Sequence, residues 1–179
     1  MPDPKNDITA EFVRNLFDYD EKSAQLIWKK TVSQGRKSRG GNSKPGKVAG
    51  MIFTNGYRVI KIKINGKRRY YLAHRLIHLY RTGEWPAAHI DHKDRNPADN
   101  SQIRPATRSQ NQANRGKQRN NTSGYKGVIK VKNRKNSWTA RIGLHGKSYY
   151  LGFFRTPEAA YAAYCEAAKR LHGEFANFG

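Results

Sequence analysis

The adjacent residues Asp91 and His92 place a carboxylate, which binds divalent cations, beside an imidazole, which accepts protons near neutral pH. A phosphodiester resists hydrolysis because the attacking oxygen and the phosphate are both rich in electrons. Its cleavage therefore needs a base for the water and a cation for the leaving oxygen. Asn111, Asn114 and Arg115 follow at helical spacing and supply further polar groups. Together these residue types indicate metal-assisted hydrolysis.

Two short strands and a helix must position these side chains. Residues 88–91 are expected to form the first strand, residues 93–102 a polar turn, and residues 103–106 a returning strand. A helix follows, with Thr107 or Ser109 as its cap. On such a unit the Asp–His pair lies where the first strand ends, and the asparagines share one helix face. The sequence therefore predicts that these groups converge.

The segment from Ile90 to Asn114 resembles the HNH endonucleases with a ββα-metal fold, and especially the homing type encoded by phages and introns. The resemblance implies that Asp91 and Asn111 bind one divalent metal, usually Mg²⁺ with Mn²⁺ as another accepted ion, while His92 activates water. Hard oxygen ligands suit magnesium, which keeps several waters and takes its remaining ligands from phosphate. The products implied are 5′-phosphate and 3′-hydroxyl ends.

One position departs from the family's pattern. The middle asparagine, which braces the loop carrying the histidine, falls on Gln102, and the turn before Ile103 is shorter than in the family. Gln102 offers the same amide one methylene further out, and Asn100 is the other candidate for this part of the catalytic machinery. His89 is an alternative base, but Ala88 precedes it and supplies no carboxylate. A structural or phosphate-contacting role is therefore favoured for His89.

The charge of the chain indicates a polyanionic partner. Thirty-five Lys and Arg residues against 13 Asp and Glu give a net charge of +22. The basic residues are spread from Lys29 to Lys169 and do not line one face of an amphipathic helix, which argues against a membrane partner. Cys165 is the only cysteine, so a disulfide framework and a Cys-based zinc site are excluded. No signal peptide or apolar span is evident, and the cytoplasm of the host cell is the expected location.

Residues 1–86 are expected to support the site and to contact DNA. Thr9 caps a short helix, and an alternating run over 57–64 between two Asn-Gly turns predicts an antiparallel meander. A helix with Gly83 as its stop follows the meander. Residues 29–47 contain almost nothing apolar, which predicts a mobile basic segment, either a solvated loop or an arm that orders on a phosphate backbone.

Residues 124–179 form a second module after a basic, polar linker over 115–123. Thr156 followed by proline and glutamate caps a helix that ends at Gly173, and its small alanines allow close packing on a sheet. Alternation at period two predicts three antiparallel strands, over 125–131, 138–144 and 147–154.

This module resembles an AP2 DNA-binding domain through Gly124–Val128, Trp138–Ile142, Leu151–Phe154 and His172–Phe178. The resemblance implies that the sheet face opposite the helix enters the major groove of double-stranded DNA.

DNA contacts are also expected outside this module. For His74 and Arg75 in the amino-terminal region, a buried role satisfied by backbone is the alternative to phosphate contact. The expected DNA-binding residues are Lys126, Lys130, Thr139, Arg141 and Tyr150 in the module, Arg115 and Arg119 in the linker, and His74 and Arg75.

The sequence thus predicts an α+β chain in four parts. These are an antiparallel meander with short helices over 1–86, an HNH ββα-metal motif over 87–114, the linker over 115–123, and a three-stranded antiparallel sheet packed on one helix over 124–179. The predicted function is that of a metal-dependent, site-preferring DNA endonuclease that nicks or cuts both strands without a protein partner. The competing hypotheses are a non-catalytic AP2-type DNA-binding protein with a degenerate HNH site and an RNA-binding protein.

Overall fold

The computed structural model describes residues 8–29, 44–132, 134–135 and 137–179, which form antiparallel sheets and helices as expected for an α+β chain. The chain divides into two compact units, Met1–Pro105 and Ala106–Gly179. Most of the segment predicted to be mobile and basic, residues 30–43, lies outside the described residues. Within the described ranges, no helix has the length and apolar character that a membrane crossing requires.

The first unit begins with helix α1 (Ala10–Leu16), which Thr9 caps as predicted. The Thr9 hydroxyl accepts a hydrogen bond from the Phe12 amide at 3.1 Å. Phe17, directly after α1, is extended and opens strand β1 (Phe17–Asp20). β1 pairs with β2 (Gln25–Trp28), and this pairing buries Phe17 against the ring of Trp28 at 4.5 Å between centroids.

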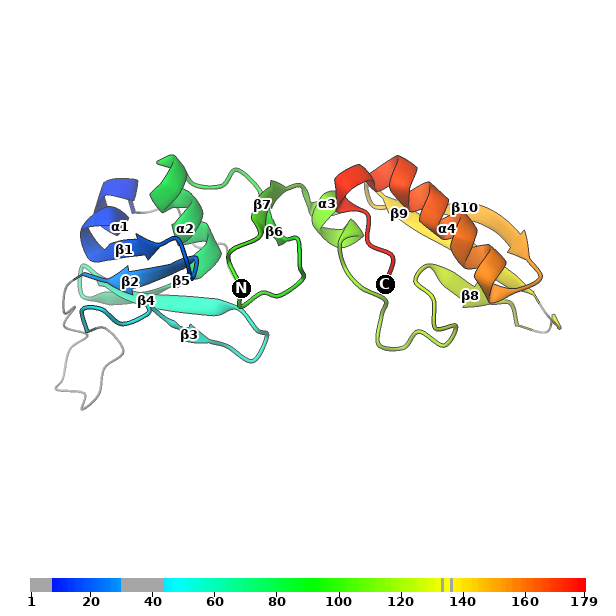
Figure 1. Cartoon of the computed structure of the whole chain (residues 1–179), viewed down its shortest axis with the longest axis horizontal. Helices are drawn as coiled ribbons and strands as arrows, with labels where there is room; N and C mark the ends of the chain where they lie inside the picture. The colour runs from blue at the N-terminus through cyan, green and yellow to red at the C-terminus, as the bar shows by residue number, and fades with distance from the viewer. Residues whose placement is uncertain (1–7, 30–43, 133, 136) are drawn as a thin grey trace. The chain divides into compact units, whose positions relative to one another are not determined.

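The meander consists of β3 (Met51–Ile52), β4 (Arg58–Ile64) and β5 (Lys67–Leu72), paired in that order (Figure 1). The turn between β4 and β5 places Asn65 and Gly66 at φ values of 48° and 77°, which is the conformation that an Asn-Gly hairpin favours. The predicted turn is therefore confirmed.

Helix α2 (Ala73–Thr82) follows β5 directly and ends at Gly83, whose φ of 85° closes it in the left-handed conformation. The inner faces of α1, α2 and the two sheets share one core. The large side chains of this core that are 1% exposed or less are Val13, Phe17, Leu26, Ile60, Ile62, Tyr71, Leu76 and Ile77. This core holds α2 and the meander in fixed positions, so that they support the segment that follows α2 in the chain.

Strands β6 (His89–His92) and β7 (Ile103–Ala106) pair as the predicted hairpin. A bond from the Lys93 amide to the Gln102 carbonyl at 2.9 Å extends the pairing by one step into the loop. β6 begins and ends one residue later than expected, so His92 is part of the strand.

The second unit contains a three-stranded antiparallel sheet in the order β10-β9-β8, with α4 along one face (Figure 1). The three predicted strands and the predicted helix are thus present. The elements are α3 (Arg108–Ala113), β8 (Val128–Lys130), β9 (Trp138–Leu144), β10 (Lys147–Phe154), α4 (Pro157–His172) and the 3-10 turn η1 (Gly173–Phe175).

Small residues bring α4 close to its sheet. Ala160 and Ala168 on the helix are fully buried against Ala140 on β9. Gly127 has a φ of +73°, and a Cβ at this position would lie 2.3 Å from Cδ2 of Tyr164. Only glycine therefore permits this approach of helix to sheet.

Lys126 ties α3 to the rest of the second unit. Its ammonium group donates to the carbonyl oxygens of Ala113 at 2.8 Å, Asn177 at 2.9 Å and Arg115. The three acceptors belong to the end of α3, the start of the linker and the carboxyl-terminal segment. These bonds use the three donors of a lysine ammonium, so Lys126 serves the fold.

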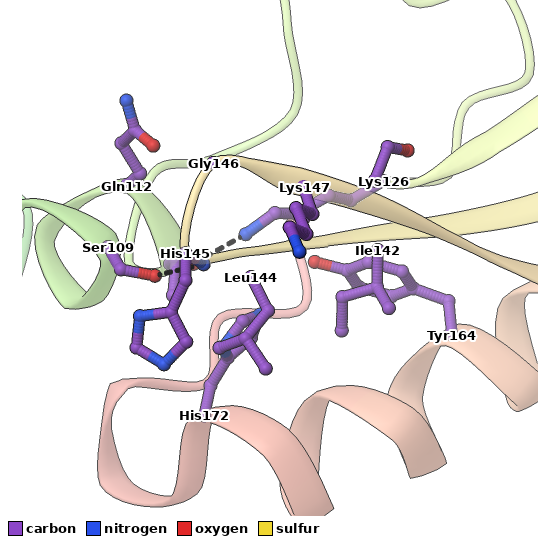
Figure 2. A pocket seen from close by; sticks show the side chains of 13 residues that line it. Ser109, Gln112, Lys126, Ile142, Leu144, His145, Gly146, Lys147, Tyr164 and His172 are labelled. Carbon is purple, nitrogen blue, oxygen red and sulfur yellow. Dashed lines mark hydrogen bonds between the residues drawn. The ribbon is translucent and has the colours of Figure 1, made fainter.

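Two further contacts hold α3 in the second unit. The Ser109 hydroxyl accepts a hydrogen bond from the His145 amide at 3.0 Å, at the turn between β9 and β10 (Figure 2). Ala106 and Ala113 pack with Phe175 of η1 in a small apolar cluster. The predicted nuclease helix is thus part of the unit that contains the C-terminal sheet.

Lys126→Met should lower the free energy of unfolding of the second unit by about 2 kcal/mol, because three carbonyls lose a charged donor. Thermal or denaturant unfolding of the full chain measures the change. Lys132→Met, which removes an exposed lysine from the same unit, is the matched control and should leave stability within about 0.5 kcal/mol of wild type. Equal stability of the two variants would contradict a structural role for the Lys126 contacts.

Candidate active site

Asp91 lies on β6 with its carboxylate 3.0 Å from the Nε atom of Arg104 on the partner strand β7. Asp91 is only 2% exposed, and an isolated carboxylate at such a position would be costly to ionise. The ion pair compensates this cost and connects the two strands.

The loop between β6 and β7 is stiffened by side chains that bond to nearby backbone amides. Asp94 accepts from the Asn96 amide at 3.1 Å, and Asn96 in turn accepts from the Ala98 amide at 3.1 Å. Asp99 accepts from the Ser101 amide at 2.8 Å, and these bonds to Ser101 lower the pKa of the Asp99 carboxyl. The loop therefore has a defined path that buries the next side chain, Asn100.

His92 is 5% exposed and lies among three side chains from separate elements. Asn100 approaches it with 3.5 Å between Oδ1 and the His92 Nε2 atom. The ring of His74 on α2 meets the His92 ring edge-on at 5.1 Å between centroids, and Tyr57 does so at 5.8 Å. The orientation of His92 is therefore restricted from several sides.

A hydrogen bond with Asn100 is compatible with only one tautomer of His92. An amide oxygen accepts but cannot donate, so Oδ1 forms a hydrogen bond only when the His92 Nε2 atom carries the hydrogen. In that tautomer the lone pair is on Nδ1. The arrangement thus makes Nδ1 the nitrogen that can accept a proton from water.

His74 has an uncharged ring at neutral pH. Burial, with smaller contributions from His92 and Arg75, lowers the pKa of His74 from 6.5 to about 3. His74 is 5% exposed, so it packs against the site and does not offer a cation to phosphate. Of the two roles open from the sequence, the buried one fits. A neutral His74 adds no charge beside His92 when His92 takes up a proton.

Tyr57 was not predicted from the sequence as part of this site. It follows the turn after β3, and its ring contacts both His74 at 5.5 Å and His92 at 5.8 Å. Gly56 lies where an added Cβ would be 2.7 Å from Cγ of Pro97 in the β6–β7 loop. The close approach at Gly56 brings the meander against this loop, which is how Tyr57 reaches the histidines.

The amide beside His92 comes from Asn100 and not from Gln102. Asn100 is 3% exposed, whereas the side chain of Gln102 is exposed and its backbone carbonyl pairs with Lys93. Of the two candidate amides, the earlier one therefore lies at the histidine. His89, the alternative base, is exposed at the start of β6. Arg75 donates to the Ala88 carbonyl at 3.1 Å and braces the chain just before β6.

Helix α3 carries Asn111, the second predicted metal ligand. Thr107 caps the helix as one of the two expected residues, in a reciprocal capping box with Gln110. The helix ends at Ala113, so Asn114 is its C-cap, and Arg115 lies beyond the helix. Asn114 keeps right-handed helical dihedrals and bonds through its amide to the Gln110 carbonyl, so it continues the last turn, whereas the helix stops short of Arg115. Asn111 belongs to the second unit, and its role as a ligand stays a prediction.

The predicted DNA-binding residues of the second unit differ in exposure. Lys130, Arg141, Tyr150, Arg115 and Arg119 are exposed. Thr139 is 7% exposed, with its hydroxyl 3.5 Å from the Ile129 carbonyl. The ammonium of Lys126 donates to three carbonyls, so its donors are used within the second unit.

The available donors suit a cation that takes few protein ligands. Within the described residues, no group of three or more His, Cys, Asp or Glu side chains could hold a metal. The carboxylate of Asp91 is a hard oxygen donor of the first unit. Magnesium keeps several waters, dehydrates reluctantly and needs few protein ligands, whereas these residues form no all-protein cage for zinc.

Residues 71–113 match the family model described as HNH endonuclease. The match spans α2, the β6–β7 hairpin and α3, and it contains Asp91, His92 and Asn100. It indicates a nuclease, for which nucleic acid is the substrate. Neither the comparison with curated proteins nor that with solved structures found a match. The similarity of the C-terminal module to AP2 domains stays a prediction.

His74→Phe should make stability less dependent on pH, because it keeps an aromatic ring and removes the titrating group. The pKa of His74 is lower in the folded state, so between pH 6.5 and 3 the unfolded state binds more protons. Wild-type stability should therefore fall with decreasing pH, by up to about 1.4 kcal/mol per pH unit from this group.

Denaturant unfolding at pH 6.5 and at pH 5 measures the effect, with the exposed His89→Phe as the matched control. Between these two values wild type and the control should lose about 1.6 kcal/mol more than His74→Phe. Parallel losses in all three proteins would show that His74 is not buried in its neutral form.

Proposed function

We propose that this chain is a metal-dependent HNH endonuclease of the homing type, which hydrolyses phosphodiester bonds in double-stranded DNA with a preference for particular sites. The observation that supports this most strongly is the buried His92, held by Asn100 next to the paired carboxylate of Asp91, within the segment that matches HNH endonucleases. Geometry and family similarity thus point to the same residues.

Asp91 and Asn111 are the proposed ligands of one Mg²⁺ or Mn²⁺ ion. When bound, the ion supplies positive charge that stabilises the phosphate and the leaving oxygen. Arg104 holds the Asp91 carboxylate at 3.0 Å and so limits the positions that it can adopt. Arg104 is a positioning residue in this account.

His92 is the proposed general base. Its Nδ1 atom accepts a proton from the attacking water, while Asn100 holds Nε2–H from the other side of the ring. The imidazolium that results lies beside a neutral His74, so no second positive charge opposes its formation. Tyr57 and His74 keep the ring from turning away.

The second unit is the proposed DNA-binding module, through the sheet face opposite α4. Arg141 and Tyr150 on that face are exposed, and Lys130 extends the cationic surface. Arg115 and Arg119 in the linker are exposed as well and are suited to follow the phosphate backbone. The net charge of +22 favours association with any duplex. The preference for particular sites must therefore come from contacts with base edges.

Supercoiled plasmid tests the proposal against a DNA-binding protein without catalysis. The full chain with Mg²⁺ should convert the plasmid to open circle or linear DNA, and EDTA should stop the conversion. Binding with no conversion, over a range of Mg²⁺ and Mn²⁺ concentrations, would favour the non-catalytic hypothesis.

His92→Ala should lower the cleavage rate by about 100-fold or more, because a general base contributes to the transition state. Affinity for DNA, measured in EDTA, should stay within about twofold of wild type, since ground-state binding does not need the base. His89→Ala removes an exposed histidine of the same strand and should cleave normally. Normal cleavage by His92→Ala would exclude this residue as the base.

Asn100→Ala and Gln102→Ala distinguish the two candidate amides. Asn100→Ala removes the contact with His92 and should reduce the maximal cleavage rate by about tenfold or more, with DNA affinity unchanged. Gln102→Ala, which truncates an exposed side chain, should cleave at close to the wild-type rate. Single-turnover kinetics at saturating Mg²⁺ measures both, and the reverse order would assign the bracing role to Gln102.

A further inference from the structure

A row of three side chains crosses the sheet of the second unit on the face opposite α4. Thr139 on β9 is paired with Ile129 on β8 and with Phe153 on β10. Ile129 is 54% exposed and Phe153 is 59% exposed, while Thr139 is enclosed between them at 7%. The row is thus apolar and exposed at both ends, with the buried Thr139 at its centre.

Aromatic and cationic groups surround this row. The Tyr150 ring, itself 50% exposed, contacts Phe153 edge-on at 5.5 Å. The guanidinium of Arg134 lies 5.7 Å from the centre of the Phe153 ring, and Arg141 is exposed two residues after Thr139, on the same side of β9. The surface is therefore apolar in the middle and positively charged around it.

The dimensions of the row suit the major groove of duplex DNA. Three neighbouring strands span about 10 Å, and the groove is about 12 Å wide. The cations around the row favour a polyanion and would repel the same cations on a second copy of the chain. Among the groups on the floor of the major groove, the apolar one is a methyl at C5 of a pyrimidine.

We propose that Ile129 and Phe153, on either side of the buried Thr139, read the C5-methyl group of pyrimidines in the major groove, so that this apolar row determines site preference. The inference rests on the proposed binding of duplex DNA by this module. Thymine and 5-methylcytosine both carry the methyl group. Specificity of this kind depends on burial of the methyl and not on hydrogen bonds to base edges.

Binding of the full chain to matched duplexes in EDTA tests this inference. A duplex selected from a random pool for tight binding is compared with two versions, one with uracil in place of thymine and one with 5-methylcytosine in place of cytosine. Loss of affinity with uracil identifies thymine, and gain with 5-methylcytosine identifies methylated cytosine. Each contacted methyl should change affinity by about fourfold, as expected for burial of one methyl-sized group.

Phe153→Ser should bind the thymine and uracil duplexes with nearly equal affinity and should keep the wild-type salt dependence, because no phosphate contact is removed. Ile129→Ser, at the other end of the row, provides a second variant. Tyr149→Ser is the matched control. Tyr149 is 44% exposed on the same strand but is paired with the core residue Ile142, and this variant should keep the discrimination.

Equal affinity of wild type for all three duplexes would overturn the proposed recognition of the C5-methyl group while leaving the nuclease proposal intact. Absence of any duplex binding would instead reject the proposed function. Tighter binding to the single strand than to the duplex would assign the aromatic row to base stacking. A self-association that Phe153→Ser abolishes would assign the row to a second copy of the chain. Either result would overturn the inference.

Discussion

The ion pair between Asp91 and Arg104 is the interaction on which the candidate active site depends. A carboxylate at 2% exposure would be strongly destabilising alone, and Arg104 provides its compensation from the opposite strand. Because the pair crosses the β6–β7 hairpin, it also sets where His92, the next residue, enters the site. A buried charge that is paired in this way has a defined position. Metal binding and proton transfer both require such a position.

Much of the fold and part of this site could be predicted from the sequence. Thr9, Gly83 and Thr156 mark helix ends through local chemistry, and the Asn65-Gly66 turn fixes a hairpin, so these features follow from short segments. The contact of Tyr57 with the histidines could not be derived in this way. It depends on packing between segments far apart in the chain, and its one local signal is the glycine at position 56, which allows Pro97 to approach.

The shortened turn shows how a departure from a family pattern is accommodated. Sequence reasoning left Gln102 and Asn100 as alternatives because both carry an amide. The structure buries Asn100 beside His92 and leaves Gln102 exposed, since the Asx turns before Asn100 direct its side chain inward. Likewise, Lys126 was expected to contact DNA because the resemblance to AP2 domains places its sheet face in the major groove. Its three carbonyl partners lie up to 51 residues away and could not be read from the pattern around it.

The central claim is that His92 acts as the base, and chemical rescue tests it most directly. His92→Gly leaves a space that free imidazole fits, beside Asn100, Tyr57 and His74. Cleavage of plasmid by this variant with Mg²⁺ should increase with imidazole concentration and saturate, whereas Asp91→Ala should show no rescue. If imidazole failed to restore cleavage to His92→Gly, or restored both variants equally, the assignment of proton transfer to His92 would be contradicted.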